Sequence, residues 1–179
     1  MIFRRSSSLL VLAAMAFPLT LAAQELPAAT RSMIVESLEG DRDMALSILD
    51  SMPEHLLRFK PVPEVRDFAQ QIDHVATSAA FLVARFVLEE SPPELGDPTV
   101  YLNDKDGLRQ VVDAAFNYCL TQLRTLPDTT LLQPTRIFGN EVPKWRVFMM
   151  IHSHDVWTLG QVVPYFRLNG MPPPAFAAF

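Results

Sequence analysis

The chain has 179 residues, a formal net charge of −5 at pH 7 and a single cysteine, Cys119. This length suits one domain with a sizeable hydrophobic core, and the lone cysteine excludes an internal disulfide. The acidic charge, with no stripe of basic residues, argues against nucleic acid as a partner.

Residues 1–23 are typical of a secretory signal peptide. Two arginines precede an apolar run over residues 9–21, and two alanines follow it. The run is shorter than the ~20 residues that a membrane-spanning helix needs. Cleavage after Ala22 or Ala23 predicts an exported, periplasmic protein with a mature charge of about −7. The alternative is an uncleaved N-terminal anchor, which is the only membrane contact that we expect.

The first two helical patterns follow this segment. The first covers residues 30–50, and Gly40-Asp41 within it predicts a kink or a break. The second covers residues 65–90, where apolar residues recur at spacings of three and four, as a buried helix face requires. His55 falls in the proline-marked connector between them, where a surface position is the simplest interpretation.

The third helix is predicted over residues 105–126, with Asp104 as its N-terminal cap. Cys119 lies on the apolar stripe of this helix, which predicts a buried, inert thiol. Gly139-Asn140 then stands between two short apolar runs, a signal for a tight hairpin. Pro143, which follows the hairpin, suits the first turn of the next helix.

The last helix is predicted from residue 144 to Asn169-Gly170. A proline inside a helix removes a backbone hydrogen bond, so we expect a bend between Gly160 and Pro164. The chain as a whole therefore predicts an all-α fold: a four-helix bundle with long crossover connections and a small hairpin-like turn before the last helix.

Two histidines on this last helix point in different directions. At about 100° per residue, His154 shares a mostly apolar stripe with Ile151 and Thr158 that faces the bundle interior, whereas His152 points away from it. Helical ligand pairs are spaced four residues apart, so the His-Ser-His spelling is weak evidence for a metal. We therefore interpret His152 as a bystander.

His74 lies on the second helix, away from the apolar stripe of that helix. Two interpretations fit this position: a solvated surface histidine, or a residue that lines a groove under another helix or loop. The helical wheel by itself favours the surface position.

Four parts of the chain resemble a known family. They are the proline-marked lead-in at residues 59–75 with His74, the Phe138-Gly139 turn, His154 followed by Gly160-Gln161, and the helix exit at residues 167–173. Their order and spacing are similar to those of the DinB/YfiT-like family of metalloenzymes, which are four-helix bundles of about this length. The resemblance covers nearly all of the mature chain, and we predict one DinB-like domain over residues 26–179.

This resemblance implies that His74 and His154 are two of three histidine ligands to a divalent metal ion, zinc or nickel. The position of the third ligand is Thr158, and a hydroxyl is a poor zinc ligand compared with imidazole, thiolate or carboxylate. Possible substitutes for the third ligand are Asp73, Asp155, Gln161 or waters.

The resemblance also implies a function. Family members include thiol-dependent transferases and isomerases, so we expect a transferase- or hydrolase-like, metal-dependent enzyme with an altered site and an unknown small-molecule substrate. The alternative is a non-catalytic helical bundle that binds a small ligand through the vestigial pocket. A third hypothesis is a homodimer formed through helix faces.

Overall fold

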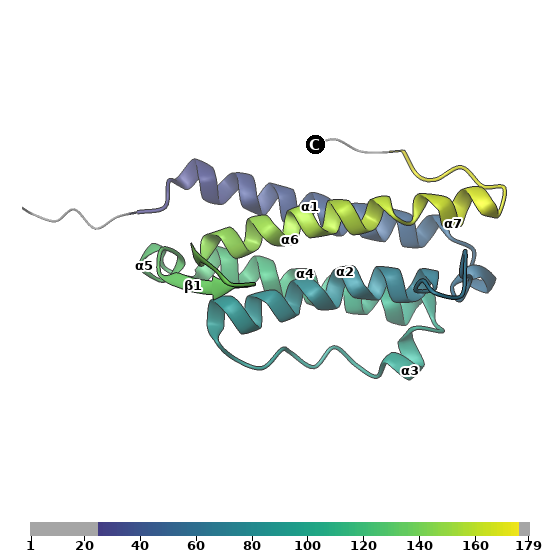
Figure 1. The fold of residues 1–179 in the computed structure, drawn as a ribbon, viewed down its shortest axis with the longest axis horizontal. Helices are drawn as coiled ribbons and strands as arrows, with labels where there is room; N and C mark the ends of the chain where they lie inside the picture. The colour runs from purple at the N-terminus through teal and green to yellow at the C-terminus, as the bar shows by residue number, and fades with distance from the viewer. Residues whose placement is uncertain (1–24, 176–179) are drawn as a thin grey trace, which may run out of the picture.

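A computed structural model describes residues 25–175, so the predicted signal segment lies outside the described residues. Four long helices form the fold: α1 (Ala28–Ser51), α2 (Phe68–Val83), α4 (Lys105–Thr125) and α6 (Trp145–Gly160). α1 and α6 run in one direction along the bundle, and α2 and α4 run in the other (Figure 1). The predicted all-α bundle is confirmed. No helix within residues 25–175 is long and apolar enough to cross a membrane.

The packing order of the helices positions the site described below. α2 packs against α4 and α6, and α1 packs against the same two helices, so α1 and α2 lie mostly on a diagonal. The connection from α2 to α4 returns along the length of the bundle (Figure 1) and includes the short helix α3 (Pro98–Tyr101). This connection is one of the predicted long crossovers, and the contact between α2 and α6 joins the two parts of the chain that carry the candidate ligands.

α1 is continuous, so the kink or break predicted at Gly40-Asp41 is wrong. A Cβ atom at Gly40 would meet nothing within 4 Å, so the glycine sits on an open part of the helix surface. Asp41 is 5% exposed and contacts His152 on α6. This tertiary contact holds the helix in a region where local propensity is weak.

α2 begins three residues later than predicted, because Asp67 starts it with a capping box. The Asp67 carboxylate accepts from the backbone N–H of Gln70, and the Gln70 side chain accepts from the backbone N–H of Asp67. Val65, the first residue of the predicted helix, precedes α2 and is 38% exposed. At its other end α2 continues as the π-helix η2 (Ala84–Leu88), which ends at Glu89 in the left-handed region, with φ 63°.

The predicted hairpin is confirmed by β1 (Pro134–Ile137) and β2 (Asn140–Pro143), which pair in antiparallel register. Its turn is Phe138-Gly139, where both residues have positive φ, 48° and 85°. Pro143 is the last residue of β2, so its predicted place in the first turn of α6 is wrong. A short helix, α5 (Asp128–Leu131), precedes the hairpin and was not predicted.

The predicted helix-capping and bending residues otherwise behave as expected. The Asp104 carboxylate accepts from the backbone N–H of Gly107 and caps α4. The predicted bend after Gly160 is confirmed, because α6 ends there and a separate helix, α7 (Val163–Leu168), continues with Pro164 in its first turn. The short 3₁₀-helix η1 (Glu54–Leu56) lies between α1 and α2, and its His55 is exposed, as predicted.

Candidate functional site

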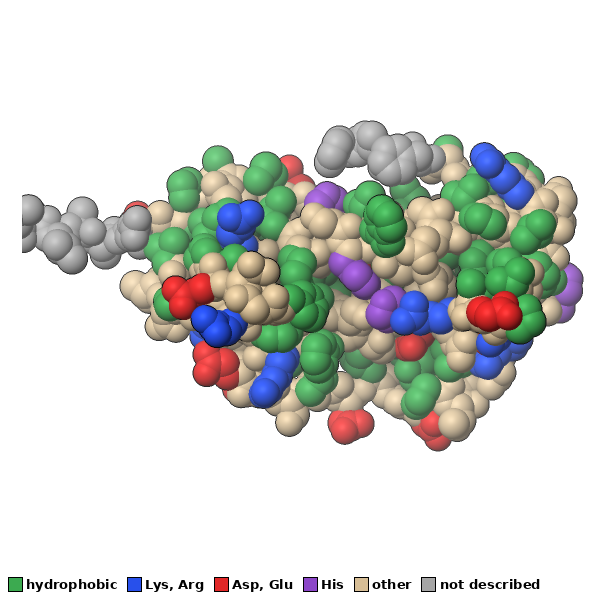
Figure 2. All heavy atoms as spheres, in the orientation of Figure 1, with side chains coloured by type: hydrophobic (Ala, Val, Ile, Leu, Met, Phe, Trp, Pro, Cys, Tyr) green, Lys and Arg blue, Asp and Glu red, His purple; other side chains and the backbone are tan. Residues whose placement is uncertain are grey.

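His74 and His154 face each other across the contact between α2 and α6. Their Nε2 atoms are 3.3 Å apart, and the two rings meet edge to face with centroids 5.0 Å apart. Both side chains are half-buried. The surface position that the helical wheel favoured for His74 is therefore wrong, because α6 covers this side of α2. Figure 2 shows histidine side chains near the middle of one face of the molecule, beside a basic side chain.

The other nitrogen of each ring, Nδ1, has its own partner. The Ser78 hydroxyl, one turn after His74 on α2, lies 3.0 Å from the Nδ1 of His74. The Asp155 carboxylate lies 3.0 Å from the Nδ1 of His154 through its Oδ1 atom. These contacts hold both rings so that their Nε2 atoms point toward each other.

Thr158 lies at the same place, one turn after His154. Its hydroxyl oxygen is 3.4 Å from the Nε2 of His154, and the residue is 3% exposed. The structure therefore brings together all three residues that the sequence singled out, with Thr158 where the resemblance expects a third histidine.

One arrangement of hydrogen atoms satisfies the contact between the two rings and both Nδ1 contacts without a metal. The Ser78 hydroxyl donates to the Nδ1 of His74, the Nε2–H of His74 donates to the Nε2 of His154, and the Nδ1–H of His154 donates to Asp155. Both imidazoles are then neutral. Burial lowers the pKa of His74 to about 4, and the nearby positive charge of Arg66 lowers it further, so its neutral form is stable at pH 7.

Asp155 is the most deeply buried acid of the site, with 0% exposure. Burial raises its pKa to about 7, against the hydrogen bond from His154, which lowers it. Its second oxygen, Oδ2, has no hydrogen-bond partner among residues 25–175. This carboxyl group therefore changes its charge close to neutral pH, directly behind the His154 ring.

The donor atoms fit a divalent metal in part. Two imidazole nitrogens on one tetrahedral zinc ion lie about 3.3 Å apart, because each Zn–N bond is about 2.0–2.1 Å. The two Nε2 atoms have this separation. A carboxylate behind a ligating histidine is also a usual feature of zinc sites, and Asp155 takes this position. However, among residues 25–175 no group of three or more His, Cys, Asp or Glu side chains is gathered to hold an ion.

The proposed substitutes for a third ligand have other partners in the structure. Oδ1 of Asp73 accepts from the hydroxyl of Tyr101 at 2.9 Å. The Oε1 atom of Gln161 accepts from the side chain of Gln71 at 3.2 Å. Asp155 contacts Nδ1 of His154, the nitrogen opposite to the one that faces His74. Thr158 or a water is then the remaining candidate for a third metal ligand close to the two Nε2 atoms.

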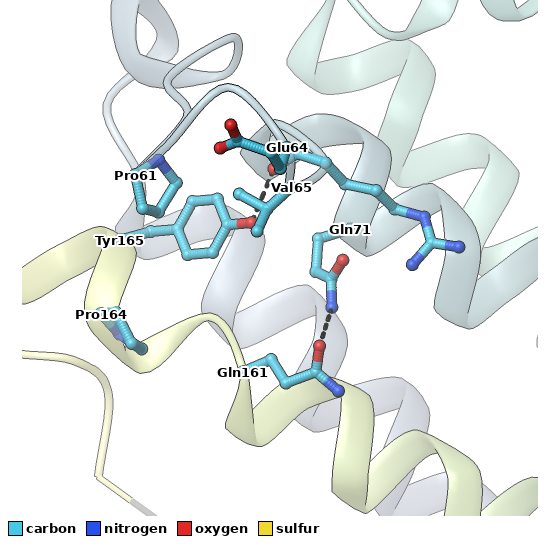
Figure 3. Close-up of a pocket in the computed structure, with 8 residues that line it drawn as sticks. Pro61, Glu64, Val65, Gln71, Gln161, Pro164 and Tyr165 are labelled. Carbon is cyan, nitrogen blue, oxygen red and sulfur yellow. Dashed lines mark hydrogen bonds between the residues drawn. The ribbon is translucent and has the colours of Figure 1, made fainter.

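An open pocket of about 720 Å³ lies near this pair of histidines, although neither histidine lines it. Gln71 connects the two, since its side-chain amide donates to Gln161 (Figure 3). The same amide also donates, at 3.4 Å, to the backbone carbonyl of Thr158. The pocket is lined by residues from the connector before α2, from α2 itself and from the bend between α6 and α7: Pro61, Glu64, Val65, Arg66, Gln71, Gln161, Pro164 and Tyr165.

The structure gives His152 a partner that the sequence did not predict. Its Nδ1 lies 2.9 Å from an oxygen of Asp41 on α1, which is buried. Burial raises the pKa of Asp41 to about 6, although the hydrogen bond and charge of His152 lower it. The signal available in the sequence was an aspartate in the middle of an apolar helix pattern. The Gly40-Asp41 dipeptide was interpreted as a break in the helix instead.

Cys119 lies on α4 and is fully buried, as predicted. Burial and the nearby charge of Asp155 raise the pKa of its thiol, so it stays protonated at neutral pH.

A family model described as the DinB superfamily matches residues 37–162 of the chain. The crystal structure of a DinB-like protein from Bacillus subtilis is similar, with 17% identity and a TM-score of 0.63, covering 80% of this chain and 96% of that chain. A DinB-like protein from Bacillus cereus is similar to the same degree, with 18% identity and a TM-score of 0.64, covering 82% of this chain and 97% of that chain. No curated protein sequence matches the chain.

Proposed function

Because this chain belongs to the DinB superfamily, we propose that His74 and His154 bind one divalent metal ion, zinc or nickel, in an altered site with Thr158 in the third position. The observation that carries the proposal is the convergence of the two Nε2 atoms, 3.3 Å apart, while the Nδ1 atoms have partners of their own. We further propose a transferase- or hydrolase-like reaction on a small molecule.

Each residue of the site has a role in this proposal. His74 and His154 are the ligands, and the Thr158 hydroxyl or a water completes the set. Asp155 keeps the His154 ring oriented and makes the Nε2 of that ring a stronger metal ligand. Ser78 does the same for His74. A divalent ion held here would polarise a substrate or lower the pKa of a bound water or thiol. The adjoining pocket offers space for the substrate.

Export belongs to the same proposal and rests on the sequence pattern of residues 1–23 alone. A cleaved segment predicts a mature protein that begins at residue 23 or 24 in the periplasm. Intact-mass measurement of the protein from a periplasmic fraction tests this, and a full-length chain in the membrane fraction would support an uncleaved anchor instead.

Metal titration of the purified protein tests the site. We expect about one equivalent of zinc or nickel to bind to the wild-type protein and to His55→Ala, whose histidine is exposed and belongs to η1. His154→Ala should lose this binding. The proposal fails if the wild-type protein binds no metal, or if His154→Ala binds it as well as the wild type does.

The second candidate function is a non-catalytic binding protein. It is favoured by the hydrogen-bonded ring pair, which is satisfied without an ion, and by the absence of a three-residue His, Cys, Asp or Glu cluster in the described part of the chain. This candidate predicts the same melting temperature with and without a chelator. A melting temperature that falls by several degrees on chelation would exclude it, because a ligand that binds only the folded state stabilises that state.

A further inference from the structure

The pocket near the histidine pair is lined by a guanidinium group, that of Arg66, which makes no ion pair within residues 25–175. We propose that Arg66 makes this pocket a binding site for a small molecule with one anionic group, a carboxylate or a phosphate, on an apolar body. This inference rests on the proposed function in one respect: the molecule would be the substrate of the site at His74 and His154.

The backbone of Arg66 is held rigidly at the edge of the pocket. Its carbonyl accepts a hydrogen bond of 2.6 Å from the hydroxyl of Tyr165 on α7 (Figure 3). The next residue, Asp67, is buried, caps α2 and accepts from Arg58 at 2.9 Å. The side chain of Arg66 therefore extends from a fixed backbone position. This reduces the conformational entropy that is lost when the side chain binds a ligand.

The guanidinium group is available for a ligand. Within residues 25–175, Arg66 makes no ion pair, and it is the arginine without one that lines this pocket. The other described arginines without an ion pair are Arg85, Arg136, Arg146 and Arg167, whereas Arg31, Arg42, Arg58, Arg109 and Arg124 each pair with an acid. Glu64 also lines the pocket, but Figure 3 shows its carboxylate pointing away from Gln71 and Gln161. A planar guanidinium with two free N–H edges is the side chain best suited to bind a carboxylate or phosphate through two parallel hydrogen bonds.

The position of this charge connects the pocket to the histidine pair. Arg66 and Gln71 line the same pocket, and Gln71 comes three residues before His74 on α2. Gln71, which is 3% exposed, lies between the pocket and the histidine pair, where it contacts Gln161 and Thr158. An anionic group held by Arg66 would therefore leave the rest of a small molecule beside the Nε2 atoms.

The other residues that line the pocket determine which kind of ligand body, apart from the anionic group, fits it. Pro61, Val65 and Pro164 form an apolar lining, and Val65 is 38% exposed. An exposed apolar side chain at the mouth of a pocket gains free energy when a ligand covers it. The pocket thus suits an aromatic or branched aliphatic body rather than a sugar or a polyol.

The test is a binding titration with three probes that share a phenyl ring: benzoate, phenyl phosphate and benzamide, the neutral analogue of benzoate. It uses the mature protein, with and without one equivalent of zinc, followed by NMR chemical shifts. We expect benzoate or phenyl phosphate to bind at least fivefold more tightly than benzamide. Whichever anion binds better identifies the anionic group. Arg66→Gln should lose this preference, and Arg66→Lys should keep part of it because it retains the charge without the planar fork.

Arg85→Gln is the matched control. It removes the same charge from the exposed surface of η2, which continues the opposite end of α2 from Arg66, on the order of 25 Å away at 1.5 Å per residue. Affinity for the anions should be unchanged in this variant. Equal affinities of the wild type and Arg66→Gln, or equal losses in Arg66→Gln and Arg85→Gln, would overturn the inference.

The outcomes of this test are independent of the metal proposal. Anion binding that depends on Arg66 in a protein that takes up no zinc would support the pocket and refute the metal site. Zinc uptake without any preference for the anionic probes would refute the pocket and leave the metal site standing.

Discussion

The Nε2 atoms of His74 and His154 lie 3.3 Å apart, although 80 residues separate the two histidines in the chain. Without a metal, this distance is a hydrogen bond from one neutral ring to the other. With a metal, both atoms must offer lone pairs. The two states of the site therefore differ in the position of one proton on His74.

The tautomer of His74 is the first prediction. In the metal-free protein His74 should carry its hydrogen on Nε2, and on zinc binding it should move to Nδ1 and donate to Ser78, since a serine hydroxyl can donate or accept. Long-range ¹H–¹⁵N spectra of the imidazoles distinguish the tautomers, with the exposed His55 as an internal control. A His74 ring that keeps its Nε2–H at one equivalent of zinc would refute ligation by this residue.

Thr158→His should strengthen metal binding. Thr158 lies one turn after His154, with its hydroxyl 3.4 Å from the Nε2 of that ring. A third imidazole there would replace a poor ligand by a good one, so we expect affinity to rise at least tenfold, about 1.4 kcal/mol. Competition with a chromophoric chelator measures this. An unchanged affinity would show that a side chain at position 158 does not reach the ion.

Asp155→Asn should weaken metal binding. The variant keeps an oxygen that can accept from the Nδ1–H of His154, but it removes the charge that makes the ring a stronger ligand. Loss of such an outer partner lowers metal affinity about 10- to 100-fold. The same competition assay applies, with Asp106→Asn on the exposed start of α4 as the control. A variant that binds as tightly as the wild type would remove Asp155 from the metal site.

Asp41 should make the stability of the bundle depend on pH. Its pKa is raised from 3.8 to about 6, so its contribution to stability is full below pH 4 and is lost as the pH rises through 6. The loss corresponds to about 3 kcal/mol for a shift of this size. Urea unfolding between pH 4 and 7 should therefore show a flatter profile for Asp41→Asn than for the wild type. Parallel profiles would show that His152 offsets the cost of burial.

Phe148 and Phe138 provide a matched pair for the core. Phe148 on α6 is fully buried, whereas Phe138 in the hairpin turn is 78% exposed. Phe148→Ala should lower the free energy of unfolding by about 3–5 kcal/mol through the cavity that it leaves. Phe138→Ala should cost less than about 1 kcal/mol. Denaturant titration of the two variants measures the difference, and equal losses would mean that the hairpin ring packs against the core more firmly than its exposure indicates.

The helices were predictable because their signals are local. Apolar spacing marked the four long helices, Asp104 marked the start of α4, and Gly160 with Pro164 marked the bend before α7. The short helices α3, α5 and η1 were missed because segments of three or four residues carry too little periodic signal. Pro143 was misplaced because a strand residue and a first helical turn both tolerate its fixed φ.

The partners of the polar residues were not predictable from spacing. The helical wheel placed His74 outside the apolar stripe of α2. His74 is half-buried beside His154 only because α6 packs on that side of α2. The same holds for Asp41 and His152, which belong to helices that are distant in sequence. For His74 the structure supports the interpretation that the wheel did not favour, a position under another helix.

The sequence by itself therefore determined where the helices lie, which faces are apolar, that Cys119 is buried and that His154 and Thr158 share one side of a helix. These features depend on the 3.6-residue turn, which any reader can count along the chain. Only the tertiary structure decided that His74 meets His154, that Asp155 and Ser78 hold their rings, and that Arg66 and Gln71 line one pocket. Those relationships depend on how α2, α6 and α7 pack, and packing is a property of the whole bundle.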